Sequence, residues 1–272
     1  MVNMIKADIK RILHSKSIWV MPIIILLMVS LVSGLFAGLK YVMSLDLSAV
    51  IGDSMDSLAA LGTIANTGYE MTMINLQSDT LIYVFLVILL SVSAFDFSSG
   101  TVKNLLSIGR TKERIYYSKL ITSCIWGVVG VITYSIISTL MGYLFFGDMI
   151  TGNEFVEILL ITLKQIPIYL SVLITGHMFV FMTQKIAFSM MLYVGSFMLF
   201  ETVIPLLDMI LDLPIKISLL MPLYQLIEMT KNEIELSAYL TVYISCTIYC
   251  VTSAICGYYT FKRSELNSTT HA

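Results

Sequence analysis

Six runs of about 20 mostly apolar residues constrain this 272-residue chain more than any other feature of its sequence. A helix of that length crosses the hydrocarbon core of a bilayer, which is about 30 Å thick. The chain is 57% hydrophobic and 12% charged, whereas soluble proteins carry about 25% charged residues. The sequence therefore predicts an all-α polytopic membrane protein with a single transmembrane domain over residues 1–272. The predicted spans are residues 18–39, 80–97, 120–146, 158–182, 186–206 and 237–261.

The basic residues indicate how these spans are oriented. Most of the 16 lysines and arginines fall in the N-terminal segment, in the loop after span two, in the turn after span four and in the tail. Loops rich in lysine and arginine stay on the cytoplasmic side of a membrane. We therefore expect a multi-pass protein of the cell membrane with both termini in the cytoplasm. The near-neutral balance, a formal net charge of −2, gives no indication of a nucleic-acid partner.

Two segments outside the spans carry their own pattern. In residues 1–17 an apolar helix face, with a basic face opposite, predicts an amphipathic helix lying on the lipid headgroups as an anchor, with or without a cytoplasmic partner. The apolar face is Ile5, Ile9, Ile12 and Leu13, and the basic face includes Lys6, Lys10 and Arg11. Residues 207–236 are apolar but interrupted by Pro214 and Pro222, so we expect a re-entrant outer segment there. Residues 40–79 are expected to form an outer loop.

The stretch between spans two and three is polar and basic, and it contains signals for a short helix between two sharp turns. Ser98, Ser99 and Gly100 interrupt the end of span two, and a helix of about two turns is expected from Thr101. Gly109 is placed to end that helix in a left-handed turn. Thr111 is placed to cap the helix that continues into span three. Residues 98–119 are then either an ordinary basic loop or a rigid elbow on which another protein can act.

These residues resemble the permeases of the ABC-2 family, the membrane subunits of a class of ATP-binding-cassette exporters. The resemblance lies in Asp96 with the following FSSGTVKNLL, then GRTKER from Gly109 and YSKL ending at Leu120. The six spans, the tight turn between spans four and five, and the segment before span six also match that family. A proline common in the family's turn is replaced here by Gly109.

The resemblance implies that the short helix docks on a separate ATPase subunit, which binds ATP and Mg²⁺. It implies a second permease subunit, identical or homologous, paired through span five with spans one and two, and export of a peptide-like or drug-like amphipathic molecule. The coupling residues would be Gly100, Thr101, Val102, Lys103, Asn104, Leu105, Leu106, Arg110, Lys112 and Arg114. Asp96, Gly109 and Lys119 would form the elbow.

The sequence contains no signature of an enzyme. No G-x-x-x-x-G-K-[ST] loop is present to hold nucleotide phosphates, and no H-E-x-x-H motif is present to hold zinc. We therefore assign neither a catalytic residue nor a metal ligand to this chain. Cys246 and Cys250, four residues apart on one helix face, are read as packing residues, with a metal pair as the other reading.

Two ionisable residues lie inside predicted spans. His177, about 9 Å from the inner end of span four, either packs in the bundle or contacts a substrate. Glu201, about 22 Å into span five, either lines a translocation path or forms a hydrogen bond near Pro205. Two functions of other classes stay open at this point. One is a membrane anchor or sensor subunit without transport, and the other is an intramembrane enzyme that depends on His177 or Glu201.

Overall fold

The computed structural model describes residues 1–44, 65–148, 150–211, 217–231 and 234–264. All regular secondary structure in these ranges is helical. Six segments are long and apolar enough to cross a membrane, which confirms the predicted all-α class and the six spans. They are Trp19–Val42, Thr80–Ser98, Lys112–Phe146, Gly152–Thr183, Ile186–Ile210 and Leu236–Arg263.

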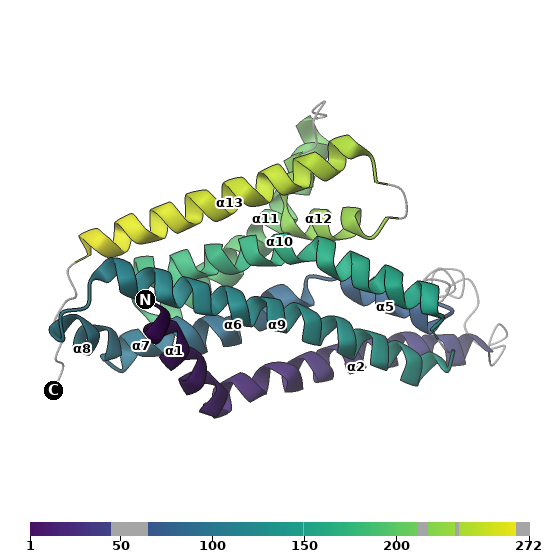
Figure 1. The fold of residues 1–272 in the computed structure, drawn as a ribbon. Coiled ribbons are helices and arrows are strands. Elements are labelled where there is room, and N and C mark those ends of the chain that lie inside the picture. Colours follow the sequence, from purple (N-terminus) through teal and green to yellow (C-terminus); the bar gives the residue numbers. More distant parts are fainter. Residues whose placement is uncertain (45–64, 149, 212–216, 232–233, 265–272) are drawn as a thin grey trace.

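The long helices run side by side and form one elongated bundle (Figure 1). At its centre α9 (Lys112–Phe146) and α10 (Gly152–Thr183) pack against each other. α2 (Lys16–Ser44) packs on α9, whereas α11 (Ile186–Leu211) and α13 (Leu236–Arg263) both pack on α10. α2 and α11 are the least buried of the spanning helices, so they form the outer sides of the bundle.

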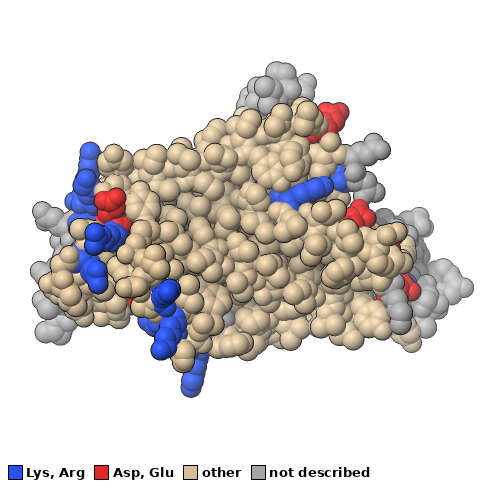
Figure 2. All heavy atoms as spheres, viewed as in Figure 1, with Lys and Arg blue, Asp and Glu red and all other residues tan. Residues whose placement is uncertain are grey.

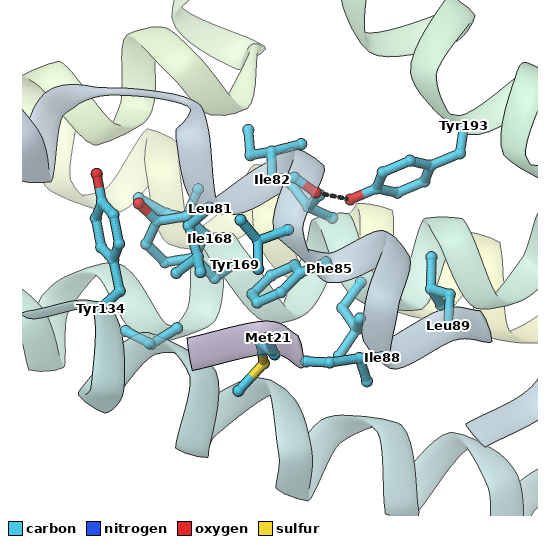
Figure 3. Close-up of a cluster of buried hydrophobic side chains, with 14 of the residues drawn as sticks. Met21, Leu81, Ile82, Phe85, Ile88, Leu89, Tyr134, Ile168, Tyr169 and Tyr193 are labelled. Carbon is cyan, nitrogen blue, oxygen red and sulfur yellow. Dashed lines mark hydrogen bonds between the residues drawn. The ribbon is translucent and has the colours of Figure 1, made fainter. Parts of the chain in front are cut away.

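A buried cluster of apolar and aromatic side chains joins these helices (Figure 3). Phe85 stands edge-on to Tyr169 of α10, with the ring centroids 5.8 Å apart. Met21 of α2 lies in the same cluster (Figure 3). Tyr193 of α11 donates its hydroxyl to the carbonyl of Ile82 at 2.7 Å. This hydrogen bond ties α11, which is otherwise poorly buried, to the second span.

The second span is a chain of three helical pieces. α6 (Thr80–Leu89) is followed by a π-helical turn η1 (Leu90–Ala94) and then by α7 (Phe95–Ser98). We had expected a single α-helix over 80–97. A π turn widens the helix by one residue and is often found where a helix serves a function. Here it changes the direction in which the residues after Ala94 face, including Asp96.

Spans four and five begin or end differently from the expectation. The helix of span four begins at Gly152 rather than at residue 158, because Thr151 and Glu154 form a capping box that starts the helix. Pro167 is accommodated inside that helix. α9 begins at Lys112, as the predicted cap at Thr111 requires, whereas α11 continues to Leu211, so residues 207–211 belong to the fifth helix and not to the segment after it.

Two short helices cover the end of the bundle opposite α8 (Thr101–Ser107). The expectation of a loop over 40–79 was wrong at both ends, since α2 continues to Ser44 and α5 occupies Gly68–Gln77. α12 (Pro222–Met229), preceded by the 3-10 turn η2 (Ile217–Leu220), lies against α10. Buried Gln165 of α10 donates to carbonyls in both short helices, to Leu76 at 2.9 Å and to Leu226 at 3.4 Å. The remainder of the predicted re-entrant segment, residues 212–216 and 232–233, lies outside the described residues.

Charge is distributed unequally between the two ends of the bundle (Figure 2). Most of the lysine and arginine side chains visible in this view lie at the end that carries α1 (Val2–His14), and most of the acidic ones lie toward the opposite end. We call these the basic end and the acidic end. Both the N-terminus and the end of α13 lie at the basic end (Figure 1).

Candidate functional site: the ion-paired elbow at the basic end

The elbow between spans two and three consists of one short helix held by two left-handed glycines. α8 spans Thr101–Ser107, which is the expected length of about two turns. Gly100 precedes it with φ +73°, and Gly109 follows it with φ +85°. The amide of Gly109 donates to Leu106 at 3.0 Å, and that of Arg110 donates to Leu105 at 3.1 Å. This pair of bonds is the Schellman termination, so the predicted role of Gly109 is confirmed.

The next helix begins immediately after this turn. The Thr111 hydroxyl accepts from the amide of Arg114 at 3.3 Å, which confirms the predicted cap. Only three residues, 108 to 110, separate the end of α8 from this cap. α8 is therefore joined to the third span by a turn with little freedom, and a displacement of one would move the other.

α8 has an inward and an outward side. Val102 is buried and Leu105 and Leu106 are partly buried against the core, as the sequence pattern predicted. Ile108, at the end of the helix, is 75% exposed. The remaining predicted coupling residues Lys103, Asn104, Arg110 and Arg114 are also on the surface. The outward side of α8 thus exposes an isoleucine beside basic residues.

Gly109 gives the first testable consequence of this geometry. We expect Gly109→Ala to destabilise the elbow by about 1 kcal/mol, because a Cβ at a positive φ meets the following carbonyl. Gly109→Asn should cost less, since asparagine tolerates the left-handed region. Hydrogen exchange of the α8 amides is the measurement. Equal exchange rates in the alanine variant and the parent chain would contradict the assignment.

Beneath the elbow, four charged side chains from three helices meet in what we call the ion junction: Asp8 and Arg11 of α1, Asp96 of α7 and Lys119 of α9. The Lys119 ammonium contacts Asp96 and lies 2.6 Å from Asp8 Oδ1. Arg11 binds Asp96 through both terminal nitrogens, one of them at 3.0 Å from Oδ2. Ser118 donates to Asp8 Oδ2 at 3.4 Å.

The ion junction is buried and electrically balanced. Lys119 is 1% exposed and Asp96 is 3% exposed, while Arg11 reaches the surface. Two carboxylates face two cations, so no charge is left uncompensated. Burial lowers the pKa of Arg11, but the hydrogen bond and charge of Asp96 raise it by more, and the net shift of that pKa is upward. These contacts bind α1, α7 and α9 to one another at one point.

The N-terminal helix is consequently more than a lipid-facing element. Ile12 is buried in the core, with Ile5 and Ile9 partly buried, whereas Lys6, Lys10 and Leu13 are exposed. The sequence pattern places Arg11 on the exposed basic face, yet its guanidinium turns to Asp96. Asp8 was not predicted as part of the site. Its position carries a signal, because Asp8 lies three residues after Ile5 and four residues before Ile12, on the inward face of the helix.

Lys112 fastens the elbow to the sixth span. Its ammonium donates to three carbonyls at the end of α13, those of Phe261 (3.3 Å), Lys262 (3.1 Å) and Ser264 (2.6 Å). A cation at the C-terminus of a helix satisfies carbonyls that have no partner within the helix. The side chain of Lys112, which the resemblance implies would contact a partner, thus binds the end of α13 in its own chain.

The two intramembrane residues lie in different places. His177 is fully buried, with its Nδ1 3.4 Å from the hydroxyl of Ser93 in the π turn and its ring against Tyr116 and Phe181. It lines neither the cavity beside Glu201 nor the one between α9 and α10. Glu201 lines a cavity toward the acidic end. The structure does not bring these two residues together, in agreement with their different predicted depths.

The cysteines also have defined surroundings. Cys246 donates its thiol to Gln225 Oε1 at 3.4 Å, and all four cysteines of the chain are free thiols. Within the described residues no three His, Cys, Asp or Glu side chains are grouped as a metal would require. The hydrogen bond to Gln225 favours the packing reading of the Cys246–Cys250 pair.

Comparison with known proteins adds no assignment. The chain matches no family model, and no curated protein is significantly similar to it.

Proposed function

We propose that this chain is the permease subunit of an ATP-driven exporter, energised by a separate ATPase subunit. The observation that carries the proposal is the elbow: a seven-residue helix exposed at the basic end and joined by short turns to two spanning helices. An element built in this way transmits a push on α8 directly to spans two and three. The resemblance to ABC-2 permeases supports the same role.

The ion junction supports the proposal by showing what would move together. Because Asp96 precedes α8 and Lys119 follows it in α9, their contact closes the elbow at its base. Arg11 and Asp8 add α1 to the same unit. A force applied at Ile108 would therefore act on three helices that are bound to one another, α1, α7 and α9, rather than on a free loop. For this coupling to do work, the ATPase must contact the elbow differently in its two nucleotide states.

The orientation and the surroundings of the chain follow from the same proposal. The basic end faces the cytoplasm of the cell, with both termini inside, as the positive-inside rule predicts. The exposed Lys6 and Lys10 of α1 then face anionic headgroups or the partner. The short helix α12 lies at the outer side as part of a re-entrant segment. ATP and Mg²⁺ belong to the partner subunit, and this chain contributes no catalytic group.

A second permease subunit completes the proposed assembly. α2 and α11 are the least buried spans and carry large exposed apolar side chains, among them Leu27, Leu31, Met191 and Met209. Lipid can cover such faces, but a single six-helix bundle provides at most half of a channel. We propose that an identical or homologous copy packs against these two helices, with the cargo, a peptide-like or drug-like amphipathic molecule, moving between the subunits.

Ile108 provides the test of the proposed coupling. The full chain is purified in mild detergent from the cells that produce it, and the associated proteins are assayed for ATP hydrolysis. We expect an ATPase to co-purify with the parent chain, and Ile108→Glu to lower its recovery by about tenfold or more, since a buried charge disfavours the contact by over about 1.4 kcal/mol.

Arg263→Gln is the matched control, because it makes the same change of charge at the same end of the bundle, on α13 and not on α8. It should retain the ATPase. Recovery of the ATPase with Ile108→Glu at the parent level would contradict the docking of α8. A partner without ATPase activity would instead support a membrane anchor or sensor subunit.

A further inference from the structure

A cavity of about 280 Å³ lies between α10, α11 and α13, with α12 at its rim. α10 packs closely against both α11 and α13, and the cavity occupies the space beside it that these two helices leave between them. Its walls include Phe179 of α10, Phe197 and Phe200 of α11, and Tyr249 of α13. Aromatic side chains of three spanning helices thus line the space.

The cavity walls are mostly apolar and carry few polar groups. Most of the lining is apolar, and a few hydroxyls, such as those of Ser171 and Thr175, are used for hydrogen bonds to the α10 backbone. Glu201 is the one carboxyl among the lining residues. Pockets that bind small molecules have this composition, with apolar and aromatic walls and very few polar groups that fix the orientation of the ligand.

Part of the Glu201 carboxyl has no partner among the described residues. Its Oε1 is buried and has no hydrogen-bond partner. The neighbouring ionisable group is Asp79 at the start of α6, a second carboxyl that interacts with it. Two carboxylates in contact repel each other unless they share a proton or have a cation beside them. The salt bridges of the described residues include none to Glu201.

We propose that this cavity binds an amphipathic organic monocation, with the apolar body against the aromatic walls and the ammonium head near Glu201. Aromatic faces attract a positive charge in addition to burying apolar surface. An inorganic divalent cation does not fit, because calcium takes six or more oxygen ligands and this lining is almost entirely carbon. The role of the ligand as exported cargo rests on the proposed function, whereas its binding does not.

The volume limits the ligand to a small molecule. A cavity of about 150 Å³ is enough to hold benzene, so this cavity accommodates an aromatic ring together with a compact head group. A suitable probe is benzyltrimethylammonium. Its carbon isostere neopentylbenzene has the same shape without the charge, so the pair separates charge recognition from the filling of apolar space.

The test measures binding of both probes to the purified chain in nanodiscs, after subtraction of the signal from empty nanodiscs. We expect the parent chain to bind the cation at least about tenfold more tightly than the isostere, because the aromatic faces and the carboxylate attract the charge of the quaternary ammonium. Glu201→Gln should remove this preference while leaving the isostere unaffected. Glu228→Gln is the matched control, because Glu228 lies toward the acidic end, pairs with Lys231 and does not line the cavity.

A second variant tests the location without changing charge. Ile204→Trp places a large side chain at the cavity wall and should weaken binding of both probes. Equal affinity for the two probes, or a preference for the cation that survives Glu201→Gln, would overturn the proposal, and the former result would mean that the two carboxyls only share a proton. No ATPase is present in this experiment, so its outcome is independent of the test with Ile108→Glu.

Discussion

Asp96→Asn is expected to lower the free energy of unfolding by about 3 kcal/mol. The substitution leaves the ammonium of Lys119, which is 1% exposed, with Asp8 as its remaining carboxylate. It also takes from Arg11 the carboxylate that it binds with two nitrogens. Breaking a buried ion pair by changing one partner costs about 3–5 kcal/mol, and the remaining Asp8 places the expectation at the lower end. Unfolding by SDS in mixed micelles is the measurement.

A double-mutant cycle separates the ion junction from a general effect of substitution. Lys119→Met alone should be similarly destabilising, since it leaves two carboxylates to one guanidinium. The double variant Asp96→Asn with Lys119→Met retains the Asp8–Arg11 pair and should be less destabilised than the sum of the single changes by more than about 1 kcal/mol. Additive losses would show that the four side chains do not act as one unit. Glu113→Gln, exposed on the same helix, should have little effect.

Gly142→Leu is expected to destabilise the acidic end by about 3 kcal/mol. A Cβ built at Gly142 of α9 would lie 2.4 Å from the carbonyl oxygen of Gly68 and 2.8 Å from Thr72 Oγ1, both in α5. The nearest atom belongs to the backbone, so the strain cannot be relieved by a change of rotamer. α5 would have to move away from α9, and its amides should exchange hydrogen faster.

Gly195→Leu is the control for this change. Gly195 lies inside α11, and a Cβ there would meet no atom within 4 Å. Leucine has a better helix propensity than glycine, so this variant should be as stable as the parent chain or slightly more stable. If both leucine variants are equally stable, then the close approach of α5 to α9 is not a feature of the folded protein.

The elbow shows which structural features local sequence signals can predict and which they cannot. Gly109 as the terminator of α8 and Thr111 as the cap of α9 are both observed as predicted. Each prediction depends on backbone preferences within a few residues, and these preferences do not depend on the tertiary structure. The assignments of Asp96, Lys119 and Arg11 were made separately, the first two as elbow residues and the third as part of a basic helix face. That they bind one another could not be read from the sequence, because 85 residues separate Arg11 from Asp96.

The errors of the sequence analysis have the same origin. α5 was not predicted, because its ten residues have no amphipathic pattern, and its close contact with α9 depends on glycines in both helices. The π turn was missed because its residues are ordinary helix-compatible ones. Asp8 was overlooked because a single acid in a basic segment is usually a solvent-exposed partner of a neighbouring lysine, and only the position of α9 places Lys119 beside it.

Hydrophobic length and local capping residues by themselves determined that this chain is a bundle of six spanning helices with a short helix between spans two and three. Both depend on free energies that act over a few turns of helix, the transfer of apolar side chains into lipid and the satisfaction of backbone groups at helix ends. Only the tertiary structure decided which polar groups meet, namely the ion junction at the basic end and the carboxyl beside the aromatic cavity. These groups lie on different helices, and the packing of apolar side chains between the helices sets the distances between them.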